Sequence, residues 1–267
     1  LPGVELPETL RATTDLESAV SNAQLIVSAT PSQFVRGVMG RAGQYIPSGS
    51  LVVSASKGIE LNTNLRMEEV LTEVLSGVLS EPLSVLSGPS FAAEVAIGVP
   101  TTVVVASREE AIAVRVRQFF QSPSFRIYTN TDITGVELGG ALKNVVALAA
   151  GVTAGLGMGH NTIAAVITRG LAEISRLGLA VGAEQATFFG LAGVGDLVLT
   201  CNASLSRNRT VGYRLGQGEP LEQILSDMTA IAEGVKTTEA AYELASQHQV
   251  EMPITEEMYA IVHQRRD

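Results

Sequence analysis

The segment LVVSASKG, residues 51–58, joins a continuous apolar run to a short turn that carries a lysine. An uninterrupted apolar run of this length, followed by small residues, is typical of a strand covered on both faces of a sheet. Ligands of open α/β sheets bind beyond the carboxyl ends of the strands. Lys57 is therefore expected to reach a bound substrate, although a solvated loop lysine would have the same sequence context.

Runs of the same kind recur on both sides of this segment and predict a sheet. The predicted strands span residues 24–29, 51–55, 83–86, 101–106 and 125–128. The predicted helices between them lie near residues 14–21, 32–44, 64–78 and 108–121. Strands that alternate with helices are typical of a doubly wound α/β sheet, whose last two strands could depart from parallel order. Ser107 and Glu110 are expected to form a capping box at the start of the last of these helices.

Beyond about residue 130 the strand pattern disappears. Residues 132–158 are rich in helix formers and small residues. Further helices are predicted near residues 161–178, 183–190, 206–216, 219–226, 235–248 and 255–264. We therefore predict an α/β domain over residues 1–130 and an all-α domain over residues 131–267.

Composition and charge narrow the functional classes. The net charge of −9 and the pI of about 4.9 argue against non-specific nucleic-acid binding, which needs Lys and Arg. The single cysteine, Cys201, fits a reducing cytoplasm and is expected to be a buried structural thiol. No secretory signal opens the chain, and the apolar stretch 145–159 is too short to span a bilayer. His160 and the other histidines lack metal-ligand spacing, so no metal is expected.

Lys143 is the most informative single residue. It lies in GGALKNVV, an apolar helix in which Gly139 and Gly140 stand one turn before it on the same face. These glycines are expected to leave room for another molecule. Burial disfavours the charged form of an amine and lowers its pKa, which would let Lys143 exchange a proton near neutral pH. A lysine that snorkels or pairs with a carboxylate is the alternative.

Three further segments carry residues suited to binding. Gly88 and Ser90 follow a predicted strand in the turn SGPSF and offer backbone N–H groups and a hydroxyl, although an ordinary capped turn has the same pattern. Asp196 follows GVG and either caps a helix or orients Lys143. The segment SRNR, residues 206–209, combines a helix start with guanidinium groups, which suits either a phosphate site or a solvated basic face.

Taken together, these motifs resemble one family. The segments SASKGIE, LSGPSFAAEVA, GVELGGALKNVVALAAG, ITRGLAEISRLG, GLAGVGDLVLTC, SRNR, AEGVKTT and VEMPITEEMY occur in the order found in bacterial NAD(P)-dependent sn-glycerol-3-phosphate dehydrogenases. The resemblance runs from about residue 29 to the end of the chain, and its specificity lies in the common order of eight motifs. It implies a Rossmann-type doubly wound domain, whose first strands are missing from this sequence, followed by an all-α dehydrogenase domain.

The resemblance also implies a reaction. Members interconvert dihydroxyacetone phosphate and sn-glycerol 3-phosphate with NAD or NADP, in the cytoplasm, and supply glycerol 3-phosphate for phospholipid synthesis. A small phosphorylated substrate and a homodimer are therefore expected. A different two-domain reductase of hydroxy acids and a non-catalytic binding protein on the same fold are the competing interpretations.

Site residues follow from the resemblance, position by position. It implies that Lys143 is the catalytic proton donor and acceptor. The residues implied to bind substrate are Lys57, Gly88, Ser90, Lys143, Asp196, Thr200, Ser206, Arg207 and Asn208. The residues implied to bind the cofactor are Lys57, Ala92, Arg207, Ile231 and Glu233.

The chain departs from the family pattern at its start. No G-x-G-x-x-G motif follows a strand there, and the glycines at 151 and 155 lie in the helical half. The sequence opens downstream of the family's first strand and glycine-rich turn, and its last helical stretch is expected to be shorter than the family's. The expected cofactor site is therefore the part that this sequence contains.

Overall fold

The computed structural model describes residues 3–228, 231–264 and 266 of the chain. The first half of this described part contains a five-stranded sheet with the strand order β1-β2-β3-β4-β5. The strands are β1 (Leu25–Ser28), β2 (Leu51–Ser54), β3 (Ser84–Ser87), β4 (Thr101–Ser107) and β5 (Phe125–Asn130). The strands predicted from the apolar runs are confirmed, with small differences at their ends.

Strand direction divides the sheet into two parts. β1, β2 and β3 run parallel, β4 runs antiparallel to β3, and β5 runs parallel to β4. The expected departure from parallel order is thus confirmed. Because β1, β2 and β3 share a direction, their carboxyl ends meet at one edge of the sheet. Because β5 runs the other way, the chain leaves the sheet at the opposite edge.

Helices cover both faces of the sheet. They are α1 (Leu16–Val20), α2 (Val35–Ala42), α3 (Met67–Val74) and α5 (Glu110–Phe120), with 3-10 turns at Ser32–Phe34 (η1) and Gly43–Tyr45 (η2). The short helix α4 (Ala92–Ala96) buries none of its residues. Val52 of β2 packs with α2 and α3 on one face, whereas Leu51 and Val53 pack with α5 on the other. Burial of alternate residues on opposite faces explains the continuous apolar run. The doubly wound arrangement is confirmed.

The predicted capping box before α5 is wrong. Ser107 is the last residue of β4, and its buried Oγ donates a hydrogen bond to the carbonyl oxygen of Leu83 at 2.9 Å. The N-cap position of α5 is Glu109, which makes no side-chain cap bond. The spacing of Ser107 and Glu110 matched the motif, but β4 extends one residue beyond the apolar run and takes the serine into the sheet.

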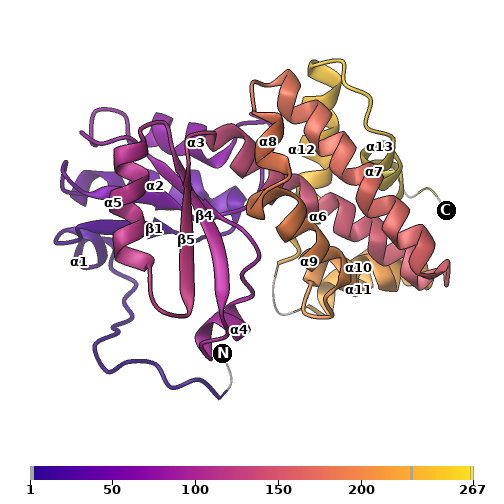
Figure 1. The fold of residues 1–267 in the computed structure, drawn as a ribbon, viewed down its shortest axis with the longest axis horizontal. Helices are drawn as coiled ribbons and strands as arrows, with labels where there is room; N and C mark the ends of the chain where they lie inside the picture. The colour runs from indigo at the N-terminus through magenta and orange to yellow at the C-terminus, as the bar shows by residue number, and fades with distance from the viewer. Residues whose placement is uncertain (1–2, 229–230, 265, 267) are drawn as a thin grey trace.

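The rest of the described chain is helical. Its elements are α6 (Ile133–Gly155), α7 (Gly159–Ala180), α8 (Gln185–Phe188), the π-helical segment η3 (Leu191–Gly195), α9 (Asp196–Asn202), α10 (Arg207–Gly216), α11 (Leu221–Ser226), α12 (Glu233–Gln247) and α13 (Pro253–His263). Figure 1 shows the sheet and its helices beside this helical part, with α6 extending from one into the other. The predicted change from α/β to all-α structure is confirmed.

Helix α6 forms the centre of the helical part. Asp132 fixes its start, because the carboxylate accepts hydrogen bonds from the N–H of Gly135 at 2.8 Å and from Thr187 Oγ1 at 2.6 Å. By length and mean hydropathy α6 could cross a membrane. The helical segment from α8 to α9 and the helix α10 would pass the same test only if the two, which meet at a bend, formed a single span. In this fold 83% of the apolar window of α6 is buried by other elements, as expected of a core helix.

Glycines bring α10 into backbone contact with α6. A Cβ atom added to Gly151 would collide with the carbonyl oxygen of Arg209, and one added to Gly212 would collide with the carbonyl oxygen of Leu148. A Cβ at Gly155 would likewise meet the backbone of α10 at Gly216. The glycines of the AAGVTAG segment therefore allow close helix packing, which places the amino end of α10 next to the middle of α6.

Candidate active site

The carboxyl ends of the parallel strands open onto a cavity of about 610 Å³ between the sheet and the helical part. This volume lies in the usual range of small-molecule sites. The lining residues that the sequence predicted as site residues are Lys57, Ser90, Lys143, Thr200, Ser206, Arg207, Asn208, Ile231 and Glu233. Residues separated by more than a hundred positions in the chain therefore converge on one cavity.

Two lysines share one carboxylate at the floor of this cavity. Lys143 Nζ donates to Asp196 Oδ1, and Lys57 Nζ donates to Asp196 Oδ2 at 2.6 Å. Lys143 also donates to Thr200 Oγ1 at 2.8 Å, and Lys57 to the carbonyl oxygen of Gly88 at 3.1 Å. Lys57 and Gly88 therefore lie at the same edge of the sheet, where β2 and β3 end. Of the two readings of Asp196, the structure favours orientation of Lys143, because the N-cap position of α9 is Gly195.

A tight backbone path brings Asp196 to the lysines. Gly193, inside η3, has φ −95° and ψ −106°, which is outside helical values. A Cβ on Gly193 would collide with the backbone of Phe188, and one on Gly139 of α6 would lie 2.5 Å from the carbonyl oxygen of Ala192. The missing side chains therefore let η3 lie directly on α6, and α9 begins there with Asp196.

The expected free space beside Gly139 and Gly140 is a wrong prediction. Gly139 faces the backbone of η3, as described above. A Cβ on Gly140 would lie 2.6 Å from Ser87 Oγ and 3.6 Å from Lys57 Cδ. Both glycines therefore make room for other parts of this chain: Gly139 for the backbone of η3 and Gly140 for the side chain of Ser87, with Lys57 in ordinary van der Waals contact beside it.

The environment of Lys143 favours a neutral amine. Lys143 is only 6% exposed to solvent. Burial lowers the pKa of Lys143 to about 7, helped by the positive charge of Lys57 and opposed by Asp196. An ammonium group has three N–H donors. Two donors of Lys143 and two of Lys57 have partners among the described residues, which leaves one on each lysine for a ligand.

The amino end of α10 forms another wall of the cavity. Ser206 caps the helix, because its Oγ accepts a hydrogen bond from the N–H of Arg209 at 3.2 Å. The side chain of Arg207 is exposed and has no hydrogen bond or ion pair with the described part of the chain. Asn208 is occupied on both sides: its Nδ2 donates to Asn144 Oδ1, and its Oδ1 accepts from the N–H of Gly234, each at 2.9 Å.

Another part of the cavity wall is formed by the carboxyl end of β1 and the start of α12. Glu233 accepts hydrogen bonds from the N–H of Ser32 at 3.1 Å and from Ser32 Oγ at 2.6 Å. Ile231 also lines the cavity. Thr30, which follows β1, has a buried Oγ1 without a hydrogen-bond partner among the described residues. An unpaired buried hydroxyl at the carboxyl end of a parallel strand fits a bound ligand there.

Some predicted residues are at the margin, and some lining residues were missed. Ala92 is exposed at the start of α4 and does not line the cavity. Asn144, Thr30 and Ser56 line it but were not predicted. The signal for Thr30 was available, because it follows a predicted strand just as Lys57 does. The signal for Asn144 was weaker, since its side chain enters the site through the hydrogen bond to Asn208.

Cys201 lies close to this cluster but has the properties of a structural thiol. It is buried and free, and burial raises the pKa of its thiol to about 12. The expectation of an inert buried thiol is supported. Residues 3–228, 231–264 and 266 contain no group of three or more His, Cys, Asp or Glu side chains that could hold a metal ion.

Comparison with known proteins agrees with this geometry. Residues 1–113 match the family described as NAD-dependent glycerol-3-phosphate dehydrogenase N-terminus, and residues 132–267 match its C-terminus. A protein of Geobacter sulfurreducens named glycerol-3-phosphate dehydrogenase [NAD(P)+] is 55% identical over 99% of this chain and 79% of its own length.

Solved structures give the same result. A crystal structure of glycerol-3-phosphate dehydrogenase from Coxiella burnetii superposes with a TM-score of 0.95 at 38% identity, over 100% of this chain and 81% of that one. A ketopantoate reductase structure from Ralstonia eutropha, at 13% identity and a TM-score of 0.58 over 94% of this chain and 78% of that one, shares the fold alone. The chain therefore belongs to the NAD-dependent glycerol-3-phosphate dehydrogenase family.

Proposed function

We propose that the cavity around Lys143 is the site at which this NAD(P)-dependent oxidoreductase interconverts dihydroxyacetone phosphate and sn-glycerol 3-phosphate. One observation carries the assignment to this cavity. A buried lysine with a pKa of about 7 lies at the floor with one N–H left for a ligand. Such a group can give or take a proton at neutral pH.

In this proposal Lys143 acts as the general acid and general base of the reaction. During reduction its ammonium form donates a proton to the oxygen of the substrate carbonyl. During oxidation its neutral form removes the hydroxyl proton. Asp196 and Thr200 hold Nζ in place for both directions, because each binds it directly. The reacting group is therefore oriented before substrate arrives.

Lys57 supplies a second positive charge at the same oxygen. Its Nζ is fixed by Asp196 and by the carbonyl oxygen of Gly88, and its remaining N–H can stabilise negative charge on the substrate. Ser90 lies beside this position, where its hydroxyl donates to the same Gly88 carbonyl at 3.1 Å. Gly88 and Ser90 are therefore proposed to contact the substrate.

The phosphate of the substrate is proposed to bind at α10. Arg207 has no partner among the described residues, and the free N–H groups of a helix start favour an anion. Ser206 and Asn208 stand on either side of Arg207. Because the protein carries a net charge of −9, a local basic group is needed to attract an anionic substrate.

The NAD or NADP that the family uses supplies or accepts the hydride when it is bound. The residues at the β1 end of the cavity fit such a ligand, because the buried hydroxyl of Thr30 has no partner in the described part of the chain and the carboxyl ends of three parallel strands meet there. Ile231, Glu233, Lys57 and Arg207 are proposed to hold it. Ala92 stays a prediction at the margin of the site.

Four further expectations accompany this function. We propose that the domain boundary falls between residues 130 and 131, after β5 and before α6. We also propose that the protein works as a homodimer in the cytoplasm. Its product would serve phospholipid synthesis, as the family resemblance implies.

A substrate panel tests the proposal. Oxidation of NADH and NADPH is followed spectrophotometrically with dihydroxyacetone phosphate, with unphosphorylated dihydroxyacetone and with a branched 2-keto acid. We expect turnover with the phosphorylated ketone and at least a hundredfold lower kcat/KM with the other two, because both lack the group that Arg207 would bind. Preference for the keto acid would assign the cavity to a hydroxy-acid reductase instead.

A further inference from the structure

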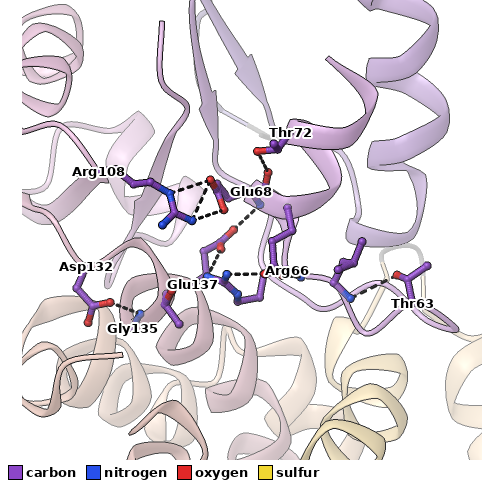
Figure 2. A network of polar contacts seen from close by, with 11 residues as sticks. Thr63, Arg66, Glu68, Thr72, Arg108, Asp132, Gly135 and Glu137 are labelled. Carbon is purple, nitrogen blue, oxygen red and sulfur yellow. Dashed lines mark hydrogen bonds and ion pairs between the residues drawn. The ribbon is translucent and has the colours of Figure 1, made fainter. Parts of the chain in front are cut away.

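A second buried charge cluster lies where the loop that follows Lys57 returns to α6 (Figure 2). Arg66 ends this loop at the N-cap position of α3. Its Nη1 donates to Thr134 Oγ1 at 2.8 Å and to Glu137 Oε2 at 3.3 Å, and its Nη2 donates to Glu69 Oε1 at 2.7 Å. The guanidinium therefore joins α3 to α6.

Glu137 completes this connection from the α6 side. Its Oε1 accepts a hydrogen bond from the backbone N–H of Glu68 at 2.8 Å, in the first turn of α3. Its side chain is 7% exposed. A carboxylate at the start of a helix satisfies a free N–H group and interacts favourably with the helix dipole. Glu137 of α6 thus caps α3, a helix from the other half of the molecule.

The loop between Lys57 and Arg66 is tied down along its length. Ile59 is fully buried in the core of the helical part. Gln33 holds the loop from the sheet side, because its Nε2 donates to the carbonyl oxygen of Ile59 at 2.8 Å and its Oε1 accepts from the N–H of Leu61 at 3.0 Å. A shift at Arg66 would therefore be passed along a constrained segment toward Lys57.

We propose that Glu137 is a positioning residue: by capping α3 and pairing with Arg66, it seats loop 58–66 on α6 and so fixes Lys57 relative to Lys143. The two lysines need this precision because they share Asp196. Glu137 stands about 9 Å along α6 from Lys143 and does not touch the cavity. This role rests on the function proposed above.

The charge of Glu137 depends on pH within a usable range. Burial raises the pKa of its carboxyl group to about 8, with Arg66 and the Glu68 N–H acting in the opposite direction and the charges of Glu68 and Glu69 acting with burial. Above about pH 8 the carboxylate is ionised and accepts both hydrogen bonds at full strength. Below that value a bound proton weakens the pairing with Arg66.

The test compares Glu137→Gln with Glu69→Gln in oxidation of glycerol 3-phosphate at pH 9 and pH 6. Each variant removes one carboxylate from the same guanidinium, but Glu69 lies on α3 itself, so only Glu137→Gln cuts the contact with α6. We expect Glu137→Gln to lower kcat/KM roughly tenfold at pH 9, the worth of a charge-assisted hydrogen bond. At pH 6 the loss should be under about twofold, because wild-type Glu137 then holds a proton. Glu69→Gln should lose under about twofold at either pH.

Two kinetic results with a folded Glu137→Gln variant would overturn the positioning role. One is wild-type kcat/KM for a folded Glu137→Gln variant at pH 9. The other is an equal loss at both pH values, which would show a general structural defect. If Glu137→Gln does not fold, Thr134→Val removes one bond of Arg66 to α6 and should lower kcat/KM roughly threefold at pH 9; no loss would contradict the proposal.

Hydrogen exchange separates this proposal from the proposed function. Amides 58–66 should exchange several-fold faster in Glu137→Gln than in the wild type at pH 9, with no substrate present. Faster exchange in a protein that does not oxidise glycerol 3-phosphate would support the seating of the loop while the proposed function fails. Unchanged exchange would overturn the seating, whatever the turnover.

Discussion

Two buried charge clusters contact the same helix, α6, and their charge balance is opposite. At Lys143, two ammonium groups share the carboxylate of Asp196. At Arg66, one guanidinium binds the carboxylates of Glu69 and Glu137. The first cluster has an excess of donors and faces a cavity. The second has an excess of acceptors and joins two helices.

Burial acts on both clusters in the same physical way but with different results. It favours the neutral form of each group, so it lowers the pKa of Lys143 to about 7 and raises that of Glu137 to about 8. For Lys143 the neutral form is a usable base. For Glu137 the neutral form is a weaker helix cap. Spare hydrogen-bonding capacity facing a cavity, and not burial alone, therefore marks the reactive cluster.

Removing Lys143 should have the largest effect. Lys143→Ala is expected to lower kcat by about 10²–10⁴, the usual worth of a general acid–base. Asp196 keeps its bond to Lys57, so the protein should fold and still bind substrate in part. Steady-state kinetics measures the change, with Lys236→Ala, an exposed lysine on α12, as the matched control. Wild-type turnover in the Lys143 variant would move the reactive group elsewhere.

Removing Arg207 should have the next largest effect. Arg207→Ala is expected to cost about 2–4 kcal/mol in kcat/KM for dihydroxyacetone phosphate, through loss of charge-assisted bonds to the phosphate. Unphosphorylated dihydroxyacetone should be affected much less. Arg209→Ala, on the same helix but outside the cavity lining, is the control. Equal losses of kcat/KM with both ketones would show that Arg207 does not bind the phosphate.

The pH dependence of turnover should follow Lys143. Oxidation needs the neutral amine, so its kcat/KM should fall about tenfold per unit below pH 7. Above pH 7 only the smaller rise that accompanies ionisation of Glu137, at about pH 8, should remain. Reduction needs the ammonium form, so its kcat/KM should fall as the pH rises through about 7. The profiles are measured in both directions at saturating cofactor. An oxidation profile that stays flat down to pH 5 would exclude Lys143 as the base.

The smallest effect is expected at Cys201, which is buried beside the lysine cluster. Burial raises the pKa of its thiol to about 12, so it carries almost no thiolate at neutral pH. Cys201→Ala should leave kcat within about twofold of the wild type and lower the free energy of unfolding by about 1–2 kcal/mol. Chemical denaturation and kinetics together check this. A large loss of kcat at wild-type stability would contradict a structural thiol.

The sequence predicted the sheet, the change to helices and half of the residues that line the cavity. Apolar runs such as residues 51–53 located the strands because both faces are covered. Lys57 and Lys143 were recognisable because ligands bind at strand ends and because a charged group inside an apolar helix is costly unless it has a partner. The roles of these residues in catalysis stay predictions until they are measured.

Other features could not be predicted because they depend on contacts distant in sequence. Gly139 and Gly140 suggested open space, but η3 and Ser87 fill it. Ser107 matched a capping motif, yet sheet pairing took it into β4. Glu137 showed no local signal, because its partners Arg66 and Glu68 lie about seventy residues earlier.

The glycine contacts between α6 and α10 have a consequence for mutational scanning. Added methyl groups at Gly151, Gly155, Gly212 or Gly216 would collide with the facing backbone. Even alanine at these positions would push α10 away and displace Arg207. A scan scored by growth would then rank four residues that touch no ligand alongside the lysines. These positions would not tolerate substitution because the two helices lie too close together. A map of essential positions would therefore contain the active-site residues and also the glycines that set the distance between α6 and α10.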